Sequence, residues 1–596
     1  MNQKKLRLYL ALFVAGMLLL VTLLFLRYRL TPIVSLGRGL FMDMTHPTGT
    51  LVLETAPSFI IAPQVSGSTE QANDTNVASK KTHDWPSFNR SLTGERFTPL
   101  TEINNDSVQS LKVLCSYDTG QYSIFQTGLL MVDGMLIGTT ERDIFSLDPG
   151  NCQENWRTHE TFKTGLLQGV NRGAAYADGR LFRGSQDGQV LAYDSKTGQK
   201  LWSTLIADAS KGESVSAAPI AWHGRVFIGN AGGDFKGVKG RMYALDAATG
   251  KIIWEFYLVP KDHQAINRSP SQDSQADAVA SWGNANDVPI SGGASWTSYS
   301  LDPDTGRLYI PAGNPAPDFV KGARAGDNLY SGSVVILDAL TGQYLQHLQL
   351  VPHDWHDWDV SNAPAIFQTR GGRKILSVAP KNGYLYGFDL ANLQPLYRSA
   401  ITRIENAEAE FSTETGTHFC PGSMGGAEWN GPSYNPKTNL VMVGEIDWCT
   451  TVTMQNTAQI KDTQNGATWA GMASRNPFHT FGKQDPHQDW AGWLYATDAD
   501  SGAWQWRLKS NYPILSGVTS TAGDLVLFGD MGGNFYAVDA RTGQQRWGEK
   551  IGGAIGGGVI TYEYHGQQKI AVATGMTSVL WPTESVTARV IILGLP

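Results

Sequence analysis

One pattern recurs along the chain and constrains its fold more than any other feature of the sequence. It reads apolar-aromatic-x-apolar-Asp-x-x-Thr-Gly-x-x-x-Trp, and clear copies end at Trp156, Trp202, Trp254 and Trp547. Counted with weaker copies, the repeated aspartates are Asp148, Asp194, Asp246, Asp338, Asp389, Asp498 and Asp539. Most are 41 to 52 residues apart, with two gaps of 92 and 109 residues. Unrelated hairpins would not keep Asp, Gly and Trp in register so often.

Each copy predicts a strand, a tight turn and a second strand. The Asp caps the turn and the Gly supplies a positive φ, while the Trp docks between neighbouring sheets. A period of 40 to 50 residues of strands and turns is typical of a β-propeller. We interpret the two long gaps as holding degenerate copies around Asp302 and Asn435. The sequence therefore predicts an all-β, eight-bladed β-propeller.

The N-terminus predicts a membrane anchor. Leu8 to Leu26 are nineteen residues without a charge, enough to cross a bilayer as a helix. Lys4, Lys5 and Arg7 precede them and favour a cytoplasmic N-terminus. A cleaved signal peptide is the alternative, although its apolar run is normally shorter. We predict cytoplasmic residues 1–7, a single-pass anchor in the inner membrane at 8–26, a linker at 27–82 and a periplasmic domain at 83–596.

Charge and cysteine content exclude some functions. The net charge is −7 with no basic run, so nucleic acid is not an expected partner. No CxxC or CxxCH occurs, so neither a metal cluster nor covalently attached haem is supported. Export would favour two disulfides among the four cysteines. Cys115 and Cys152 flank the first predicted blade and are expected to pair.

The segment Val351–Asp359, VPHDWHDWD, is the first candidate for a functional site. If it is extended, Trp355, Asp357 and Asp359 share one face, with the two carboxylates roughly 7 Å apart. Carboxylates that close repel unless a cation or a shared proton lies between them. A polar loop with helix caps is the alternative interpretation.

Further short motifs follow one another along the chain. They are GVNRG with Arg172, GNAGGDFKGVKGR with Asp234, GGASW with Trp296, AGNPAP with Asn314 and APKNG with Lys381. With the repeat and HDWHDWD, they make the chain resemble the quinoprotein alcohol dehydrogenases, which use pyrroloquinoline quinone (PQQ) in an eight-bladed propeller. The resemblance runs from Trp85 to the C-terminus and includes an opening DWPSFNRSLTGERFTPLTEIN and a closing-blade segment, GGAIGGGVITYEYHGQQKIAVATGM.

The resemblance implies a role for each matching residue. Asp357 matches the catalytic base, and the implied metal ligands are Asp234, Asn314, Asp357 and Asp359. Trp296 matches the floor on which the quinone stacks, Arg172 a residue that holds a quinone carboxylate, and Lys381 a cation near the quinone carbonyls. The other implied cofactor contacts are Gln126, Ser216, Gly232, Gly233 and Glu428. Cys420 and Cys449 match a family disulfide.

Two features depart from the family pattern. The adjacent-cysteine pair that many members place beside the quinone is missing from the matching region, 162–166. Asp234 stands where many alcohol-oxidising members have a glutamate. The extra carboxylate of Asp359 resembles the Asp-x-Asp of lanthanide-using members, but it also occurs in glucose-oxidising members that use divalent ions. The expected cofactors are therefore PQQ with calcium or a lanthanide.

The implied reaction is oxidation of an alcohol or polyol, in which Asp357 takes the hydroxyl proton. Electrons would pass to an external acceptor, either a cytochrome c or ubiquinone, because no haem is encoded in the chain. An aldose dehydrogenase of the glucose-oxidising type is one alternative. A non-catalytic propeller that scaffolds envelope proteins is another, but it gives no reason to retain the site residues together. No motif identifies the substrate.

Overall fold

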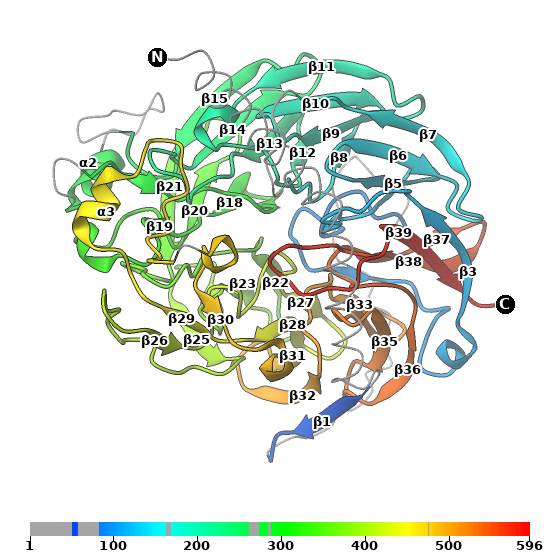
Figure 1. Cartoon of the computed structure of the whole chain (residues 1–596). Coiled ribbons are helices and arrows are strands. Elements are labelled where there is room, and N and C mark those ends of the chain that lie inside the picture. Colours follow the sequence, from blue (N-terminus) through cyan, green and yellow to red (C-terminus); the bar gives the residue numbers. More distant parts are fainter. Residues whose placement is uncertain (1–49, 58–82, 163–168, 262–272, 284–287, 475) are drawn as a thin grey trace, which may run out of the picture.

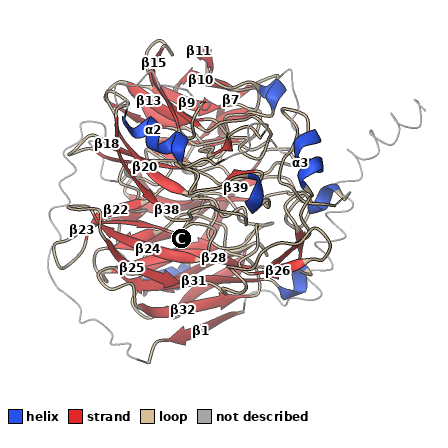
Figure 2. Ribbon diagram, turned by 90° about the vertical axis from the view of Figure 1, so that its left-hand side faces the viewer, coloured by secondary structure: helices blue, strands red, loops and turns tan. Residues whose placement is uncertain are grey.

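The computed structural model describes residues 50–57, 83–162, 169–261, 273–283, 288–474 and 476–596. Within them, eight sheets of four or five strands are arranged around a common centre like the blades of a propeller (Figure 1). Seen from the side in Figure 2, strands dominate and the few helices lie at the periphery. The predicted all-β propeller is confirmed.

Blades one to four follow the chain in order. Their strands are β4 (Leu130–Val132), β5 (Met135–Thr139), β6 (Asp143–Leu147) and β7 (Glu154–His159); β8 (Ala175–Ala177), β9 (Arg180–Gly184), β10 (Gln189–Asp194) and β11 (Lys200–Leu205); β12 (Ile220–Trp222), β13 (Arg225–Gly229), β14 (Arg241–Asp246) and β15 (Ile252–Tyr257); β17 (Ser300–Asp302), β18 (Arg307–Pro311), β20 (Ser333–Asp338) and β21 (Tyr344–Gln349).

Blades five to eight complete the ring. Their strands are β22 (Ala365–Gln368), β23 (Lys374–Val378), β24 (Tyr384–Asp389) and β25 (Pro395–Ala400); β27 (Ser433–Asn435), β28 (Leu440–Asp447), β31 (Ala491–Asp498), β32 (Trp504–Ser510) and β1 (Leu51–Thr55); β2 (Phe97–Thr98), β33 (Thr519–Thr521), β34 (Leu525–Gly529), β35 (Asn534–Asp539) and β36 (Gln545–Lys550); β37 (Val559–Tyr564), β38 (Gln567–Thr574), β39 (Arg589–Gly594) and β3 (Lys112–Asp118).

Smaller elements lie in the connections between these blades. They are the pair β16 (Ser291–Gly292) and β19 (Pro315–Ala316), the sheet β26 (Thr417–Phe419), β29 (Thr450–Val452) and β30 (Lys483–Gln484), the helices α2 (Asp273–Ala280) and α3 (Thr457–Asp462), and the 3-10 turns η1 (Ser107–Ser110), η2 (Ala209–Lys211), η3 (Lys321–Ala323), η4 (Pro477–His479) and η5 (His487–Asp489).

The second blade shows why the repeat contains Asp, Thr, Gly and Trp at fixed positions. The Oδ1 atom of Asp194 accepts the backbone N–H (2.9 Å) and the hydroxyl (2.8 Å) of Thr197, which closes the turn after the third strand. Gly198 has φ 69°, and a Cβ there would lie 2.3 Å from the ring of Trp156 in the preceding blade. The Trp156 indole donates to the carbonyl of Ser195 at 3.1 Å. The repeat is therefore a blade-to-blade contact as well as a turn.

The next two blades repeat this contact. The indole N–H groups donate from Trp202 to the Ala247 carbonyl (3.2 Å) and from Trp254 to the Ala339 carbonyl (3.1 Å).

Two details of the repeat interpretation are wrong. Asp302 and Asn435 do not begin additional blades, because they lie in hairpins between the first two strands of blades that already carry Asp338 and Asp498. The eighth blade instead lacks the motif and is built from both ends of the described domain. Its outer strand β3 pairs with β39, so a blue strand lies against a red one in Figure 1.

The segment predicted as a linker is ordered in part. Residues Leu51–Thr55 form β1, which pairs antiparallel with β32 at the edge of blade six. Glu54 forms an ion pair with Arg507, and Leu53 reaches the turn at Gly543. An unpaired outer strand offers backbone donors and acceptors that a nearby apolar segment can satisfy.

The predicted anchor, 8–26, lies outside the described residues. Across the part of the chain that the structure describes, no helix is long and apolar enough to cross a membrane. Both predicted disulfides, Cys115–Cys152 and Cys420–Cys449, are present.

Candidate active site

The segment Val351–Asp359 is a loop between β21 and β22, so the extended conformation considered from the sequence is wrong. Asp354 causes the difference, because its two carboxylate oxygens accept the backbone N–H groups of His356 (3.0 Å) and Trp358 (2.9 Å). This bends the chain, and Asp357 adopts the left-handed conformation with φ 65°. Asp tolerates that region better than most residues.

Apolar packing holds the loop in place. The imidazole of His356 stacks on Trp358 with ring centroids 3.9 Å apart, and both side chains are buried. Burial lowers the pKa of His356, so the ring is neutral near pH 7. The Trp358 indole donates to the Pro421 carbonyl at 3.0 Å, next to the Cys420–Cys449 disulfide. The loop is thus rigidly supported around Asp357.

Asp357 and Asp359 still meet, at the ammonium group of Lys381. Its Nζ atom lies 3.1 Å from a carboxylate oxygen of each, and all three side chains are buried. Burial alone would lower the pKa of Lys381, but the charges of Asp357 and Asp359 outweigh it and raise that pKa well above its usual value. Burial raises the pKa of Asp357 well above the ordinary range, although Lys381 opposes the shift.

Three carboxylates converge beside this pair. One oxygen from each of Asp234, Asp318 and Asp357 lies within 4.8 Å of the others. Burial, and next the charge of Asp359, raises the pKa of Asp234 to about 7, while Lys381 lowers it. Asp318 was missed in the sequence, where a single Asp after AGNPAP carries no spacing signal. Asp359 is not among the three, because its Oδ1 accepts the backbone N–H of Asn314 at 2.9 Å and its Oδ2 accepts from Lys381.

A long connection in blade six secures the segment that carries Asp234. The Lys236 ammonium donates to the carbonyls of Lys461 (2.7 Å) and Thr463 (2.8 Å), at the C-terminal end of α3, where free carbonyls favour a cation. The backbone N–H of Trp469 donates to the Asp234 carbonyl at 2.6 Å. A Cβ at Gly232 would lie 2.3 Å from the Gly212 carbonyl oxygen, so this approach requires glycine.

An aromatic and cationic group forms the other half of the site. The guanidinium carbon of Arg172 lies 4.5 Å from the ring centroid of Trp296 and 5.2 Å from that of Trp429. Arg172 and the Ser216 hydroxyl both donate to the Trp296 carbonyl, at 3.0 and 3.1 Å. The side-chain nitrogen of Gln126 lies 3.9 Å from the sulfur of Met576, which packs in the same cluster as Trp429 and Trp296. Trp429 is a second residue that the sequence did not single out.

Glu428 links the two halves electrostatically. It is buried, and its charge is felt by Lys381 on one side and by Arg172 on the other. Burial, and then the charge of Asp359, raises the pKa of Glu428 to about 7 against the opposing effects of Lys381 and Arg172. The acidic half around Asp357 and the aromatic half around Arg172 therefore lie in one region, whereas the predicted Cys115–Cys152 pair lies elsewhere in the ring. Most of 162–166, where the cysteine pair is missing, lies outside the described residues.

The shift at Glu428 makes the stability of the cofactor-free protein depend on pH. A raised carboxyl pKa means that the unfolded state ionises near pH 4.5 while the folded state holds its proton up to about 7. Stability therefore falls as pH rises through this window, by up to about 3 kcal/mol. We expect Glu428→Gln to be more stable than wild type by this amount above pH 7, with the difference vanishing near pH 4.5. Denaturant unfolding between pH 5 and 8 measures it.

The control is Glu549→Gln, on the exposed outer strand β36. Parallel stability curves for wild type and Glu428→Gln across the pH range would contradict the prediction.

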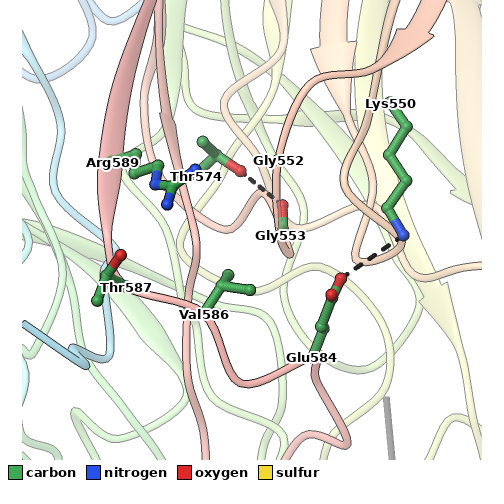
Figure 3. Close-up of a pocket in the computed structure, with 8 residues that line it drawn as sticks. All are labelled: Lys550, Gly552, Gly553, Thr574, Glu584, Val586, Thr587 and Arg589. Atoms are coloured by element: carbon green, nitrogen blue, oxygen red, sulfur yellow. Dashed lines mark hydrogen bonds and ion pairs between the residues drawn. The ribbon is translucent and has the colours of Figure 1, made fainter. Parts of the chain in front are cut away.

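A separate surface pocket lies elsewhere on the ring. It has a volume of about 270 Å³ and is lined by residues of β36, β38, β39 and nearby loops (Figure 3). Its charged groups are satisfied locally, since Lys550 lies 3.6 Å from Glu584 and Arg589 pairs with Asp118. None of its lining residues belongs to the region of Asp357. The buried acidic and cationic side chains lie around Asp357 and not in this pocket.

Family models match two parts of the chain. Residues 85–410 match the PQQ model described as "Glucose/ethanol/alcohol dehydrogenase, beta-propeller domain", and residues 491–588 match a model described as "Outer membrane protein assembly factor BamB".

Curated relatives resemble most of the chain. The dehydrogenase subunit of alcohol dehydrogenase (quinone) from Gluconobacter oxydans (strain 621H) is 30% identical over 553 residues, which cover 83% of this chain and 70% of that protein. Lanthanide-dependent methanol dehydrogenase from Methylacidiphilum fumariolicum (strain SolV) is 28% identical, with coverage of 83% and 84%.

Solved structures share the architecture. Quinohemoprotein alcohol dehydrogenase ADHIIG from Pseudomonas putida HK5 matches with a TM-score of 0.76 and 26% identity, covering 87% of this chain and 81% of that one. A europium-containing methanol dehydrogenase matches with a TM-score of 0.74 and 24% identity, covering 87% and 99%. At that identity the second match supports the fold alone.

Proposed function

The chain belongs to the family of PQQ-dependent alcohol dehydrogenases, and from that membership we propose that it oxidises an alcohol with Asp357 as the general base. The single observation that carries the assignment of Asp357 is its carboxylate, buried beside Lys381 and facing Asp234 and Asp318. Addition of PQQ and a metal salt to the purified chain, followed by dye-linked assay on a panel of alcohols and sugars, tests the proposal.

The acidic half of the site fits a metal ion. Both carboxylate oxygens of Asp318 are buried without a hydrogen-bond partner within the described protein. Buried carboxylates facing one another are unfavourable without a counter-charge. Hard oxygen donors suit calcium or a lanthanide. We infer that Asp234, Asn314 and Asp357 hold the ion. Asp359 supports it through its contacts to Asn314 and Lys381 and remains a proposed ligand.

The aromatic half fits PQQ, which is flat and carries carboxylates. Trp296 offers a partly exposed ring, and Arg172 and Ser216 meet at its backbone carbonyl. The Nε of Arg172 and the Oε1 of Gln126 are buried polar atoms that no hydrogen bond satisfies within the described residues. Such atoms are costly unless a ligand completes them. We infer that these residues hold PQQ, with Glu428, Gly232 and Gly233 beside them.

The residues of the chain divide the catalytic work. When bound, PQQ supplies a two-electron acceptor and the metal ion a Lewis acid. Asp357 accepts the proton of the substrate hydroxyl, because desolvation makes its carboxylate a stronger base. Lys381 holds that carboxylate in place and offsets the negative charge around it. The loop closed by Asp354 limits the motion of Asp357 relative to the substrate.

The acceptor and the location stay proposals. We propose a cytochrome c or ubiquinone as acceptor, and a periplasmic domain tethered by 8–26. An aldose substrate is the second candidate, since the matching family model also names glucose. The substrate panel separates the two. The scaffold alternative is set aside, because the curated relatives described above are dehydrogenases.

Replacing Trp296 by Ala removes the proposed stacking surface but keeps the backbone carbonyl that Arg172 and Ser216 use. We expect PQQ affinity to fall by about 30-fold, the equivalent of about 2 kcal/mol for a lost aromatic contact. Arg172→Ala should cost about as much by leaving a PQQ carboxylate unpaired. Absorbance or fluorescence titration of PQQ into the variants measures both effects.

The control is Trp504→Ala, a half-buried tryptophan on strand β32 of blade six. Unchanged PQQ affinity in both Trp296→Ala and Arg172→Ala would place the cofactor elsewhere.

A further inference from the structure

Asp318 is a buried carboxylate whose role nothing above explains. It lies two residues after the end of β19, which pairs with β16. Its exposed fraction is 0%, and among the described residues neither oxygen has a hydrogen-bond partner. Burying an ionised carboxylate in this state costs several kcal/mol. A residue that is costly to the fold and aimed at other acidic groups indicates a ligand.

The nearby cation, Arg324, does not satisfy the Asp318 carboxylate. Its guanidinium donates to the backbone carbonyls of Pro317 (3.0 Å) and Asp354 and to the Asn328 side chain (3.0 Å). These bonds hold the backbone beside Asp318 against the loop of Asp357. The backbone N–H of Phe319 adds a bond to the Ala470 carbonyl at 2.8 Å. The side chain is therefore held in place by its backbone, with its oxygens left free for a ligand.

The spacing of the carboxylates suits one ion. One oxygen from each of Asp234, Asp318 and Asp357 lies within 4.8 Å of the other two. Oxygen ligands of a calcium-sized ion lie at about 2.3 to 2.6 Å, so two ligands on opposite sides are separated by roughly 5 Å. A single cation can therefore contact all three groups without large movement.

The charge of the cluster favours a trivalent cation. Asp234, Asp318, Asp357 and Asp359 are four carboxylates, and Lys381 is the ammonium that faces them. Arg324 and Asp354 both act on Asp318, and their opposite charges cancel in the count. If the four carboxylates are ionised and Lys381 is protonated, the cluster carries a net charge of minus three. Without Asp318 the net charge would be minus two.

We propose that Asp318 is a direct metal ligand that makes this site select a trivalent ion, of the lanthanide class, over calcium. The proposal rests on the proposed function, because it concerns the same metal site. The sequence had drawn attention to Asp359 instead, as an implied metal ligand that resembles the Asp-x-Asp of lanthanide-using members. The carboxylate of Asp359 is already bonded to Lys381 and Asn314, whereas that of Asp318 is bonded to neither.

Terbium luminescence tests the proposal without an activity assay. The emission of a bound Tb³⁺ ion is read by direct excitation of the ion, so the measurement does not depend on the position of any indole. We expect Asp318→Asn in the full-length chain to weaken Tb³⁺ binding by roughly 100-fold, and Ca²⁺ binding, measured by competition, by only about 10-fold. Luminescence lifetimes in H₂O and D₂O should show about one more water on Tb³⁺ in the variant.

The controls separate the two ways of failing. Asp530→Asn changes a buried carboxylate that is hydrogen-bonded to Ser510, Asn534 and Tyr536 in blade seven, and it should bind Tb³⁺ as wild type does. If wild type binds neither ion, the proposed function fails. If wild type binds Tb³⁺ and Asp318→Asn matches it in affinity and bound water, or loses equal affinity for both ions, Asp318 does not select the ion and the inference is overturned. The smaller Asp318→Ser replaces the Asn variant if that variant does not fold.

Discussion

Asp357→Asn is expected to lower kcat by about 10²- to 10⁴-fold at saturating metal and PQQ, the contribution typical of a general base. Asparagine has the size of aspartate and also tolerates the left-handed conformation that Asp357 adopts, so the loop closed by Asp354 should keep its shape. Its amide oxygen can still accept from Lys381, but it cannot accept a proton from an alcohol. Steady-state kinetics with PQQ occupancy measured by absorbance gives the result.

The readouts for this variant distinguish catalysis from binding. PQQ should remain bound, because Arg172, Trp296 and Ser216 lie in the other half of the site. Asp530→Asn is again the matched control, since it removes a buried carboxylate that does not belong to the acidic cluster. Residual activity within 10-fold of wild type, at full metal and PQQ occupancy, would show that another group takes the proton.

The propeller could be predicted because the residues of its repeat form the contact between neighbouring blades. Asp194 closes the turn, Gly198 allows the close approach of Trp156, and Trp156 contacts the next blade. Because the same contact recurs between successive blades, the same residue types recur at regular intervals in the sequence. The count was right for a partly wrong reason. The hairpins at Asp302 and Asn435 look like the repeat, while the eighth blade joins two ends of the chain and has no local signature.

The site could be predicted only where one short segment contains several chemically active residues. HDWHDWD drew attention to Asp357 and Asp359, but its conformation depends on Asp354 bonding across the turn, which alternation along a strand does not describe. Asp318 and Trp429 are single residues in ordinary contexts. Their importance comes from distant partners, Asp234 in one case and Arg172 in the other, and only the folded ring brings those together.

Removal of the Cys115–Cys152 disulfide is expected to lower the stability of the ring at the point where it closes. Cys115 lies in β3, the outer strand of the blade that joins the two ends, and Cys152 lies in the turn between β6 and β7 of blade one. The disulfide therefore links the closing blade to its neighbour, beside the β3–β39 pairing. Replacing both cysteines by alanine is expected to cost about 3 to 4 kcal/mol of unfolding free energy in the chain-entropy account. Denaturant unfolding measures the cost.

A matched pair separates ring closure from chain entropy. The Cys115–Cys152 and Cys420–Cys449 bonds span 37 and 29 residues, so loop entropy alone predicts nearly equal losses. Their positions predict different local effects. Without Cys115–Cys152, amide hydrogen exchange should rise in β3 and β39, because opening of the seam no longer requires a covalent bond to yield. Without Cys420–Cys449, exchange should rise instead around Trp358, whose indole donates to Pro421. Equal exchange at the β3–β39 seam in both variants would mean that blade pairing alone closes the ring.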